Sequence, residues 1–186
     1  MRVLASCTVS LAEGFARFGR SGETPRPLAF ADLSELRQTM SEDNTILAGD
    51  LTDFRRAADN VRLAQLGSLL CASTLGSAWS PADTAIIGLN GDGCAHNNRL
   101  FWDDFTAHGH ESGKASLFVP TLPSIPVCEA AITLGVRGPV RYLKTASEAQ
   151  TEELLSEMFA SDNSLQQIMT VETNACGAVV NLLARE

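Results

Sequence analysis

Residues 116–139 read SLFVPTLPSIPVCEAAITLGVRGP, and this proline-rich and then apolar segment carries the strongest structural signal in the chain. Pro126 suits the first turn of an α-helix, where the N–H group that proline lacks would have no partner inside the helix. The residues after it are apolar on nearly every side of a helical wheel, which predicts a buried helix. Gly135 and the pair Gly138 and Pro139 then end that helix.

The sequence on either side of this segment alternates between strand-like and helix-like patterns. Short runs of β-branched and small residues predict strands, and apolar residues at helical spacing predict helices. The expected strands are 2–10, 45–48, 83–89, 140–144, 165–171 and 178–183. The expected helices are 31–40, 54–75, 98–108, 126–134 and 147–160, and residues 19–27 are an expected loop. The alternation predicts an α/β domain with a mixed, roughly five-stranded sheet, helices on both faces and a C-terminal antiparallel hairpin.

Composition restricts the possible partners. The 186 residues include 14 basic and 22 acidic side chains, a formal net charge of −8, and 45% are hydrophobic, which suffices for the core of one domain over residues 1–186. The acidic balance argues against a nucleic-acid partner, because such proteins use basic surfaces to displace counterions. The 5 cysteines are scattered without a CxxC pair, which is typical of reduced thiols in a cytoplasmic protein. No apolar run reaches the length of a transmembrane helix, so no membrane partner is expected.

Four further stretches, taken with residues 116–139, resemble one enzyme family in their order and spacing. They are DFRRAADNVRLAQLGSLLCASTL at 53–75, DTAIIGLNGDG at 83–93, VRYLKTAS at 140–147 and EAQTEELLSEMFASDNSLQQIMTVETN at 148–174. Together they resemble the N-terminal half of the β-ketoacyl synthases, the acyltransferases that condense acyl chains on a carrier protein. The resemblance implies a single thiolase-like half and no cofactor.

Two departures from the family pattern imply that this chain does not catalyse condensation by itself. In the family a second, similarly folded half supplies both catalytic histidines and part of the oxyanion hole, whereas this chain stops after the hairpin. His96, His108 and His110 do not match the family's histidine positions. Ser147 stands where the family keeps its nucleophilic cysteine.

Ser147 is the candidate catalytic residue, but its surroundings favour a structural role. A serine hydroxyl gains little from a helix dipole and needs an adjacent base, and no histidine is expected beside it. Glu148 adds negative charge, which disfavours an alkoxide or a malonyl carboxylate nearby. Gln150 lies three positions after Ser147, which is the spacing of a capping box. We therefore predict that Ser147 caps the helix 147–160, and Thr145 is a second candidate cap.

The helix 147–160 is predicted to present an acidic face to water. Its apolar side carries Thr151, Leu154, Leu155, Met158 and Phe159, and its other side carries Glu148, Glu152, Glu153, Ser156 and Glu157. In a complete condensing enzyme, the resemblance implies, this helix is buried between the two halves. Burying four unpaired carboxylates would be prohibitively costly. We therefore expect no second half to pack on this helix in the usual way.

Three other features have polar residues close together in the sequence. The three histidines lie near Asp103, Asp104 and Glu111, but their loose spacing predicts a solvated surface and no metal site. The run NGDG at 90–93 lacks the lysine of a phosphate loop and is predicted to be a tight turn. Arg137, Arg141 and Lys144 lie near the expected site, where they either attract an acidic acyl carrier protein or simply decorate a strand and a loop.

The leading functional hypothesis is a non-catalytic β-ketoacyl synthase-like protein, a structural or regulatory partner in fatty-acid or polyketide-type synthesis. The expected assembly is a homodimer or a heterodimer with an active ketosynthase, because the family's counterpart of strand 165–171 pairs with its twin across a dimer. The helix 126–134 is expected near that interface. Two alternatives stay open. One is a serine-based acyl-transfer or thioesterase enzyme that uses Ser147. The other is a binding module for an acyl chain or a carrier protein, with a pocket under residues 121–126.

Overall fold

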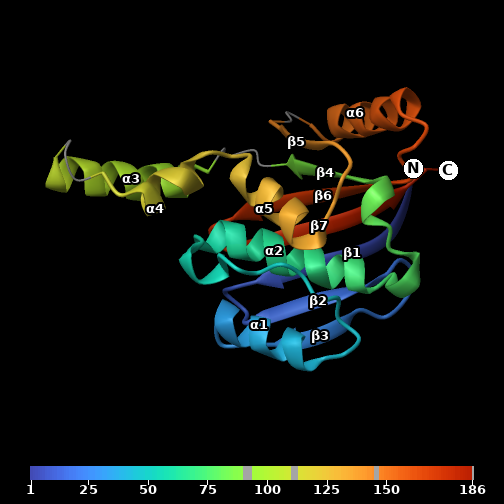
Figure 1. The fold of residues 1–186 in the computed structure, drawn as a ribbon, viewed down its shortest axis with the longest axis horizontal. Helices are drawn as coiled ribbons and strands as arrows, with labels where there is room; N and C mark the ends of the chain where they lie inside the picture. The colour runs from blue at the N-terminus through green and yellow to red at the C-terminus, as the bar shows by residue number, and fades with distance from the viewer. Residues whose placement is uncertain (90–93, 110–112, 145–146, 186) are drawn as a thin grey trace.

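The computed structural model describes residues 1–89, 94–109, 113–144 and 147–185 (Figure 1). Its strands are β1 (Arg2–Ser10), β2 (Phe15–Arg20), β3 (Arg26–Ala29), β4 (Thr84–Leu89), β5 (Val140–Leu143), β6 (Gln167–Asn174) and β7 (Gly177–Ala184). Its helices are α1 (Leu33–Glu42), α2 (Asp59–Ser73), α3 (Ala95–His108), α4 (Ala115–Phe118), α5 (Ile125–Leu134) and α6 (Glu148–Ser161), with 3-10 turns that include η1 (Phe54–Arg56) and η5 (Val119–Thr121). The predicted α/β class is confirmed.

The strands form one mixed sheet of 7 strands in the order β3-β2-β1-β7-β6-β4-β5. β4 is parallel to its neighbours β5 and β6, whereas all other neighbouring pairs are antiparallel. β6 and β7 are the predicted C-terminal hairpin, and the Asn174 side chain accepts the N–H groups of Cys176 and Gly177 at 2.8 and 3.1 Å. These bonds hold the turn tight. The sheet is wider than predicted because β2 and β3 extend it beyond β1.

The hairpin of β2 and β3 lies where the sequence pattern predicts only a loop, at residues 19–27. In the structure, residues 21–25 alone connect the two strands. Pro27 pairs with Arg17 of β2, and the sheet accepts it because β3 is an edge strand, where a missing N–H donor is tolerated. The turn-forming residues therefore predict the position of the loop between β2 and β3 correctly, but the predicted loop is too long.

Helices cover the two faces of the sheet unequally (Figure 1). α1, α2 and α5 cover one face, and α2 buries 13 of its 15 residues there. α6 lies on the opposite face, where Leu155, Met158 and Phe159 pack against Ile87 of β4 and Ile168 of β6. Helices on both faces are thus confirmed, with α6 restricted to the side of the sheet that contains β4 and β6.

α5 begins and ends where the proline and glycine signals predict. Pro126 lies in its first turn, and Gly135 ends it with a φ of +65°, a left-handed conformation that favours glycine. At position 138 a glycine is needed for a different reason. A Cβ atom there would lie 2.2 Å from the backbone oxygen of Thr84, so no larger residue fits without a shift of the backbone. Most of α5 is buried as predicted, but Ile132 is 58% exposed.

Two further sequence-based boundaries are wrong. Residues 45–48 form no strand, because Asp43 and Asp50 each begin a tight turn that is closed by the threonine two residues later. The long helix starts at Asp59 instead of residue 54, since Ala58 has an extended backbone and residues Phe54–Arg56 make a separate 3-10 turn. The apolar periodicity that suggested one helix therefore spans two elements.

β6 is an interior strand, which corrects the expected dimer contact. β4 pairs with one edge of β6 and β7 with the other, so no backbone edge is left for a twin strand. β5 lies at the end of the sheet, and within the described residues β4 is its only partner. If strands of two chains pair, the edge strands β3 and β5 are the ones with a backbone edge available in the described part of the sheet.

The five cysteines lie in different environments. Cys7, Cys71 and Cys94 are buried, Cys128 is half-buried and Cys176 is exposed, and all five are free thiols. Burial raises the pKa of the Cys71 thiol to about 12, so this group stays protonated and unreactive.

Within the described residues no single helix is long and apolar enough to cross a membrane, although the segments Ala115–Thr121 and Ile125–Leu134, bent by 93°, pass that test together.

Candidate functional site

Ser147 is the N-cap of α6, as the sequence predicts. Its backbone is extended, and its Oγ accepts the N–H of Gln150 at 3.3 Å. Among the described residues the Ser147 hydroxyl has no bond to a histidine, a lysine or a carboxylate. Thr145 and Ala146, with the second predicted cap, lie outside the described residues. Ser147 therefore acts on the backbone of its own helix, in the way that N-cap serines generally do.

A groove of about 540 Å³ lies between α6 and the uncovered part of the sheet, with Ser147 at its edge. Its carboxylates are Glu148 and Glu152 of α6 and Glu172 of β6, and no lysine, arginine or histidine is among the described residues that line it. The remaining lining residues are Val3, Leu89, Thr151, Leu155, Thr170, Asn181 and Leu183. Three carboxylates without a cation repel an acyl-thioester substrate that carries phosphate or carboxylate groups.

The two sides of α6 differ as predicted. Leu155, Met158 and Phe159 are buried, and the acidic residues of the other side are exposed. Leu154 departs from the prediction, because it is 37% exposed at the border between the two sides. The acidic surface of α6 therefore faces solvent in this chain.

Arg137, Arg141 and Lys144, the candidate residues for carrier docking, follow the edge of the sheet. Arg137 precedes β5, Arg141 lies in it and Lys144 follows it, and all three side chains are exposed. Arg141 stands opposite Ile87, whose side chain belongs to the α6 side of the sheet. Within the described residues none of the three pairs with a carboxylate. The structure thus brings them to one edge and leaves their charges available.

The histidines form no metal site within the described residues. His96 is exposed at the start of α3, and His108 lies 3.3 Å from the Asp104 carboxylate. Lys114 approaches the same carboxylate at 2.6 Å and, by donating a hydrogen bond, lowers the pKa of Asp104. His110, Glu111 and the NGDG run at 90–93 lie outside the described residues. Asp104, His108 and Lys114 therefore form a polar cluster on the surface of the described part of the chain.

Beside residues 120–126 lies a shallow groove of about 280 Å³, called here the base groove. Pro120, Thr121 and Pro126 are themselves buried. The lining is mostly small and apolar, with Ala57, Ala58 and Val61 on one side and Ala115, Val119, Pro120 and Ile125 on the other. This surface groove is not the enclosed acyl tunnel that the binding-module alternative needs.

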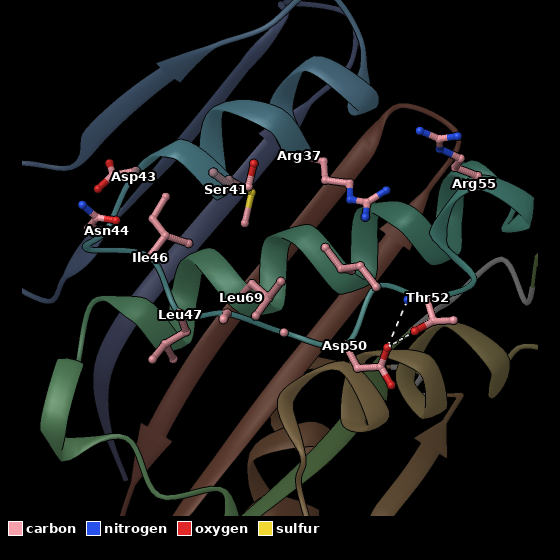
Figure 2. A pocket seen from close by; sticks show the side chains of 14 residues that line it. Arg37, Ser41, Asp43, Asn44, Ile46, Leu47, Asp50, Thr52, Arg55 and Leu69 are labelled. Atoms are coloured by element: carbon pink, nitrogen blue, oxygen red, sulfur yellow. Dashed lines mark hydrogen bonds between the residues drawn. The ribbon is translucent and has the colours of Figure 1, made fainter.

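A larger cavity, of about 710 Å³, lies between α1 and α2 and was not foreseen from the sequence (Figure 2). The segment from Asp43 to Thr52 crosses α2 and forms one wall, Leu69 of α2 lies on the floor, and Arg37 and Arg55 line one end. The guanidinium group of Arg37 lies 5.2 Å from the centre of the Phe54 ring, a cation–π contact.

Two aspartates shape the wall of this cavity through similar turns. Asp43 accepts the backbone N–H and the hydroxyl of Thr45 at 2.9 and 2.7 Å, and Asp50 accepts those of Thr52 at 3.0 and 2.6 Å. These hydrogen bonds, together with the contact between Arg26 and Asp43, lower the pKa of Asp43 to about 2. Those from Thr52 also lower the pKa of Asp50. In both turns the aspartate is followed two residues later by the threonine that it binds, and this Asp-x-Thr spacing in the sequence could have predicted the turns.

The mixed sheet with helices on both faces and a C-terminal hairpin agrees with the thiolase-like condensing fold, and solved structures support this assignment. Two of the solved structures that resemble this chain illustrate the fold. One is described as a ketosynthase in complex with its chain length factor from Xenorhabdus doucetiae, with a TM-score of 0.59 and 12% sequence identity over 100% of this chain and 80% of the matched chain. The other is the ishigamide ketosynthase/chain length factor, with a TM-score of 0.60 and 8% identity over 98% of this chain and 61% of the matched chain.

These likenesses confirm the resemblance inferred from the sequence at the level of the fold. No family model and no curated protein matches the sequence. The identities of 12% and 8% are too low to transfer residue roles, so the chemistry of the site depends on its own geometry.

Proposed function

We propose that this chain is a non-catalytic, ketosynthase-like subunit that accompanies an active ketosynthase in fatty-acid or polyketide-type synthesis. The observation that carries the proposal is the use of Ser147 as a helix cap, with no base bonded to its hydroxyl among the described residues. A nucleophilic serine needs a group that takes its proton, and the groove beside Ser147 offers carboxylates that do not bond to it. The fold likeness to chains from ketosynthase and chain length factor structures supports the role of a partner.

The electrostatics of the groove also support a role other than acyl transfer. A condensing site receives a thioester on a phosphopantetheine arm, and the extender substrate carries a carboxylate. Glu148, Glu152 and Glu172 all oppose the approach of such groups. The serine-enzyme alternative requires a base, which the described residues do not supply at the Ser147 hydroxyl.

Acylation provides the direct test of the proposal. Purified protein is incubated with acyl carrier protein and coenzyme A thioesters of several chain lengths, and its intact mass is measured. We expect no adduct. The Ser147→Ala variant is the matched control, because an adduct that forms on the native chain and disappears in this variant would establish Ser147 as a nucleophile.

The partner role is tested in the native host. The tagged chain is cross-linked in cells, and a full-length ketosynthase is expected among the captured proteins. Purified ketosynthase should then change its product length or its rate when the chain is added. A ketosynthase with the same products and rate in the presence and absence of the chain would refute the partner role, even if the acylation test gives no adduct.

We also propose that Arg137, Arg141 and Lys144 bind the acidic surface of a carrier protein. Their exposure and lack of carboxylate partners in the described residues support this role. Arg141→Glu should weaken binding of acyl carrier protein about tenfold in calorimetry, since it replaces an attraction by a repulsion. Arg2→Glu, at an exposed position of β1, is the control with the same charge change and should have little effect.

A further inference from the structure

The cavity of about 710 Å³ between α1 and α2, called here the α1–α2 cavity, is larger than either groove described above (Figure 2). It lies on the face of the sheet that α1, α2 and α5 cover, whereas Ser147 and its groove lie on the α6 side. Cavities of roughly 300 to 1,000 Å³ are of the size that accepts small organic molecules. The α1–α2 cavity therefore has room for a ligand that does not approach Ser147.

Hydrogen bonds fix the wall of the α1–α2 cavity in place. Leu47 donates its backbone N–H to the Ser73 hydroxyl at 2.9 Å, which ties the wall to α2. Asp50 is tied to α5, because its N–H bonds to the Thr133 carbonyl at 3.1 Å and its carbonyl accepts the Thr133 hydroxyl at 2.9 Å. Between these anchors, a Cβ atom on Gly49 would lie 2.9 Å from the backbone oxygen of Thr133. The wall thus rests directly on the two helices, and the cavity is preformed.

Two arginines stand at one end of the α1–α2 cavity without a counter-ion. Arg37 comes from the middle of α1 and Arg55 from η1, and both line the same end (Figure 2). The Phe54 ring, 5.2 Å from the guanidinium carbon of Arg37, supports that side chain. Among the described residues neither guanidinium group bonds to a carboxylate or to another acceptor. This end of the cavity therefore presents two positive charges and unused planar sets of N–H donors.

This pair of arginines favours a phosphate group over a carboxylate. A carboxylate carries one charge, and one arginine balances it through two parallel hydrogen bonds. A phosphate monoester has a charge of about −2 near pH 7 and three free oxygens, so it can satisfy two guanidinium groups at once. Asp43, which also lines the cavity, is already paired with Arg26 and does not neutralise the two arginines. In a chain with a net charge of −8, the arginine end of the cavity is thus a local site for an anion.

The rest of the cavity indicates what the phosphate is attached to. Asp50 Oδ1 accepts the N–H and the hydroxyl of Thr52, whereas Oδ2 has no partner among the described residues. Because those bonds lower the pKa of Asp50, its carboxylate stays ionised, and Oδ2 can accept a hydrogen bond from a ligand hydroxyl. Leu47 and Leu69 add an apolar surface further along the cavity (Figure 2).

We propose that the α1–α2 cavity binds a phosphate monoester of a small organic molecule. Arg37 and Arg55 hold the phosphate group. Asp50 accepts a hydroxyl group of the molecule, and its apolar part lies on Leu47 and Leu69. This binding needs neither Ser147 nor a ketosynthase, so the site goes beyond the proposed function.

Titration calorimetry of the purified full chain with inorganic phosphate, at low ionic strength, tests the anion site. We expect saturable binding, and Arg37→Ala and Arg55→Ala should each weaken it at least about tenfold, because each removes charge-assisted hydrogen bonds. Arg56→Ala is the matched control and should change the affinity less than about twofold. Arg56 is exposed in the same 3-10 turn as Arg55 but does not line the cavity.

Two results of this titration would overturn the proposal. One is the absence of saturable binding up to about 20 mM phosphate. The other is an affinity that neither Arg37→Ala nor Arg55→Ala lowers. Circular dichroism shows whether the variants are folded. Arg55 is exposed, so Arg55→Ala keeps the test valid even if Arg37→Ala, which loses the contact with Phe54, does not fold.

Chemical modification locates the bound phosphate within the chain. Phenylglyoxal reacts with accessible arginine side chains, and the masses of the resulting peptides report each arginine separately. Phosphate should slow the modification of Arg37 and Arg55 and leave that of Arg56 unchanged. Equal protection of all three would mean a diffuse attraction to the surface, and the cavity would then not be the site.

Two phosphate esters test the contacts to the rest of the ligand. Glycerol 3-phosphate carries hydroxyl groups and hexyl phosphate carries an apolar chain, and each should bind several-fold more tightly than inorganic phosphate. Asp50→Asn should remove most of the advantage of glycerol 3-phosphate. An ester that gains nothing over inorganic phosphate would overturn the corresponding contact, with Asp50 for the first and with the leucines for the second. None of these readouts involves acylation or a ketosynthase, so the cavity and the proposed function can fail separately.

Discussion

α2 and α3 are helices of nearly equal length with opposite surroundings. α2 buries 13 of its 15 residues between the sheet and α5, whereas α3 buries none of its 14. Both contain large apolar side chains, so hydrophobic content alone does not separate them. The difference lies in what the chain supplies around each helix. α2 packs against the chain's own sheet and α5, whereas α3 packs mainly against the short segments α4 and η5 and leaves Leu100 and Trp102 exposed.

The largest expected effect comes from shortening matched leucines in the two helices. Leu70 of α2 is fully buried, so Leu70→Ala should lower the free energy of unfolding by about 2 to 5 kcal/mol through lost contacts and the cavity left behind. Leu100→Ala in α3 should change it by less than about 0.5 kcal/mol. Urea denaturation at a low, fixed protein concentration measures both. Similar losses in the two variants would mean that α3 belongs to the core.

A glycine pair gives the next contrast. Gly138→Ala introduces a Cβ atom that meets the backbone oxygen of Thr84, which cannot move without disturbing β4. A loss of about 1 to 3 kcal/mol is expected from this overpacking. Gly113, between α3 and α4, has nothing within 4 Å of such a Cβ atom, and Gly113→Ala should be almost neutral. Thermal denaturation measures the melting temperatures of the two variants. Equal melting temperatures would contradict the close contact between Gly138 and Thr84.

Sequence patterns predicted those parts of the fold in which local chemistry and tertiary packing agree. Pro126 and Gly135 set the ends of α5 through backbone geometry alone, and Ser147 begins α6 by capping it. The hairpin β2–β3 was partly missed because an edge strand tolerates Pro27, which would break an interior strand.

Local sequence patterns did not predict the contacts between segments that are far apart in the sequence. Nothing in the local sequence of β6 indicates that both of its edges are already occupied, so the expected pairing with a twin strand was wrong. The cavity beside Arg37 depends on the path of residues 43–53 across α2, and the spacing of apolar residues in the sequence does not predict that path. At the site, the role of Ser147 as a cap was predictable because it needs only neighbours three positions away.

α6 is intermediate between α2 and α3, with one buried and one exposed side, and its cap offers a smaller test. Ser147→Ala removes the acceptor for the Gln150 N–H and should cost about 1 kcal/mol of stability. Ser156→Ala, on the exposed side of α6, should be neutral or slightly stabilising, since among the described residues its hydroxyl bonds to the backbone of Glu152 alone. Chemical denaturation should therefore rank the two variants in opposite directions. Equal stability in both would argue against the cap.

The smallest effect concerns acid stability around the cavity beside α2. The pKa of Asp43 is lowered to about 2, chiefly by its hydrogen bonds to Thr45. A carboxyl with a lowered folded-state pKa stabilises the fold above its unfolded pKa of about 4 and loses this contribution as the pH falls toward 2. Thr45→Val removes one hydrogen bond and should reduce the loss of stability between about pH 4 and 2. Denaturation curves with unchanged pH dependence would contradict this assignment.

The pairing of β1 with β7 affects how the chain can fold while it is being synthesised. Arg2 stands opposite Ala184, so β1 completes one of its two edges only after the chain from β2 to β7 has been synthesised. β2 can protect the other edge early, but the second edge stays open while the intervening chain is translated. Contacts of such long sequence separation slow folding and prolong the exposure of unpaired backbone. Nascent chains in which β7 has not yet been made should therefore bind chaperones that recognise exposed strand edges.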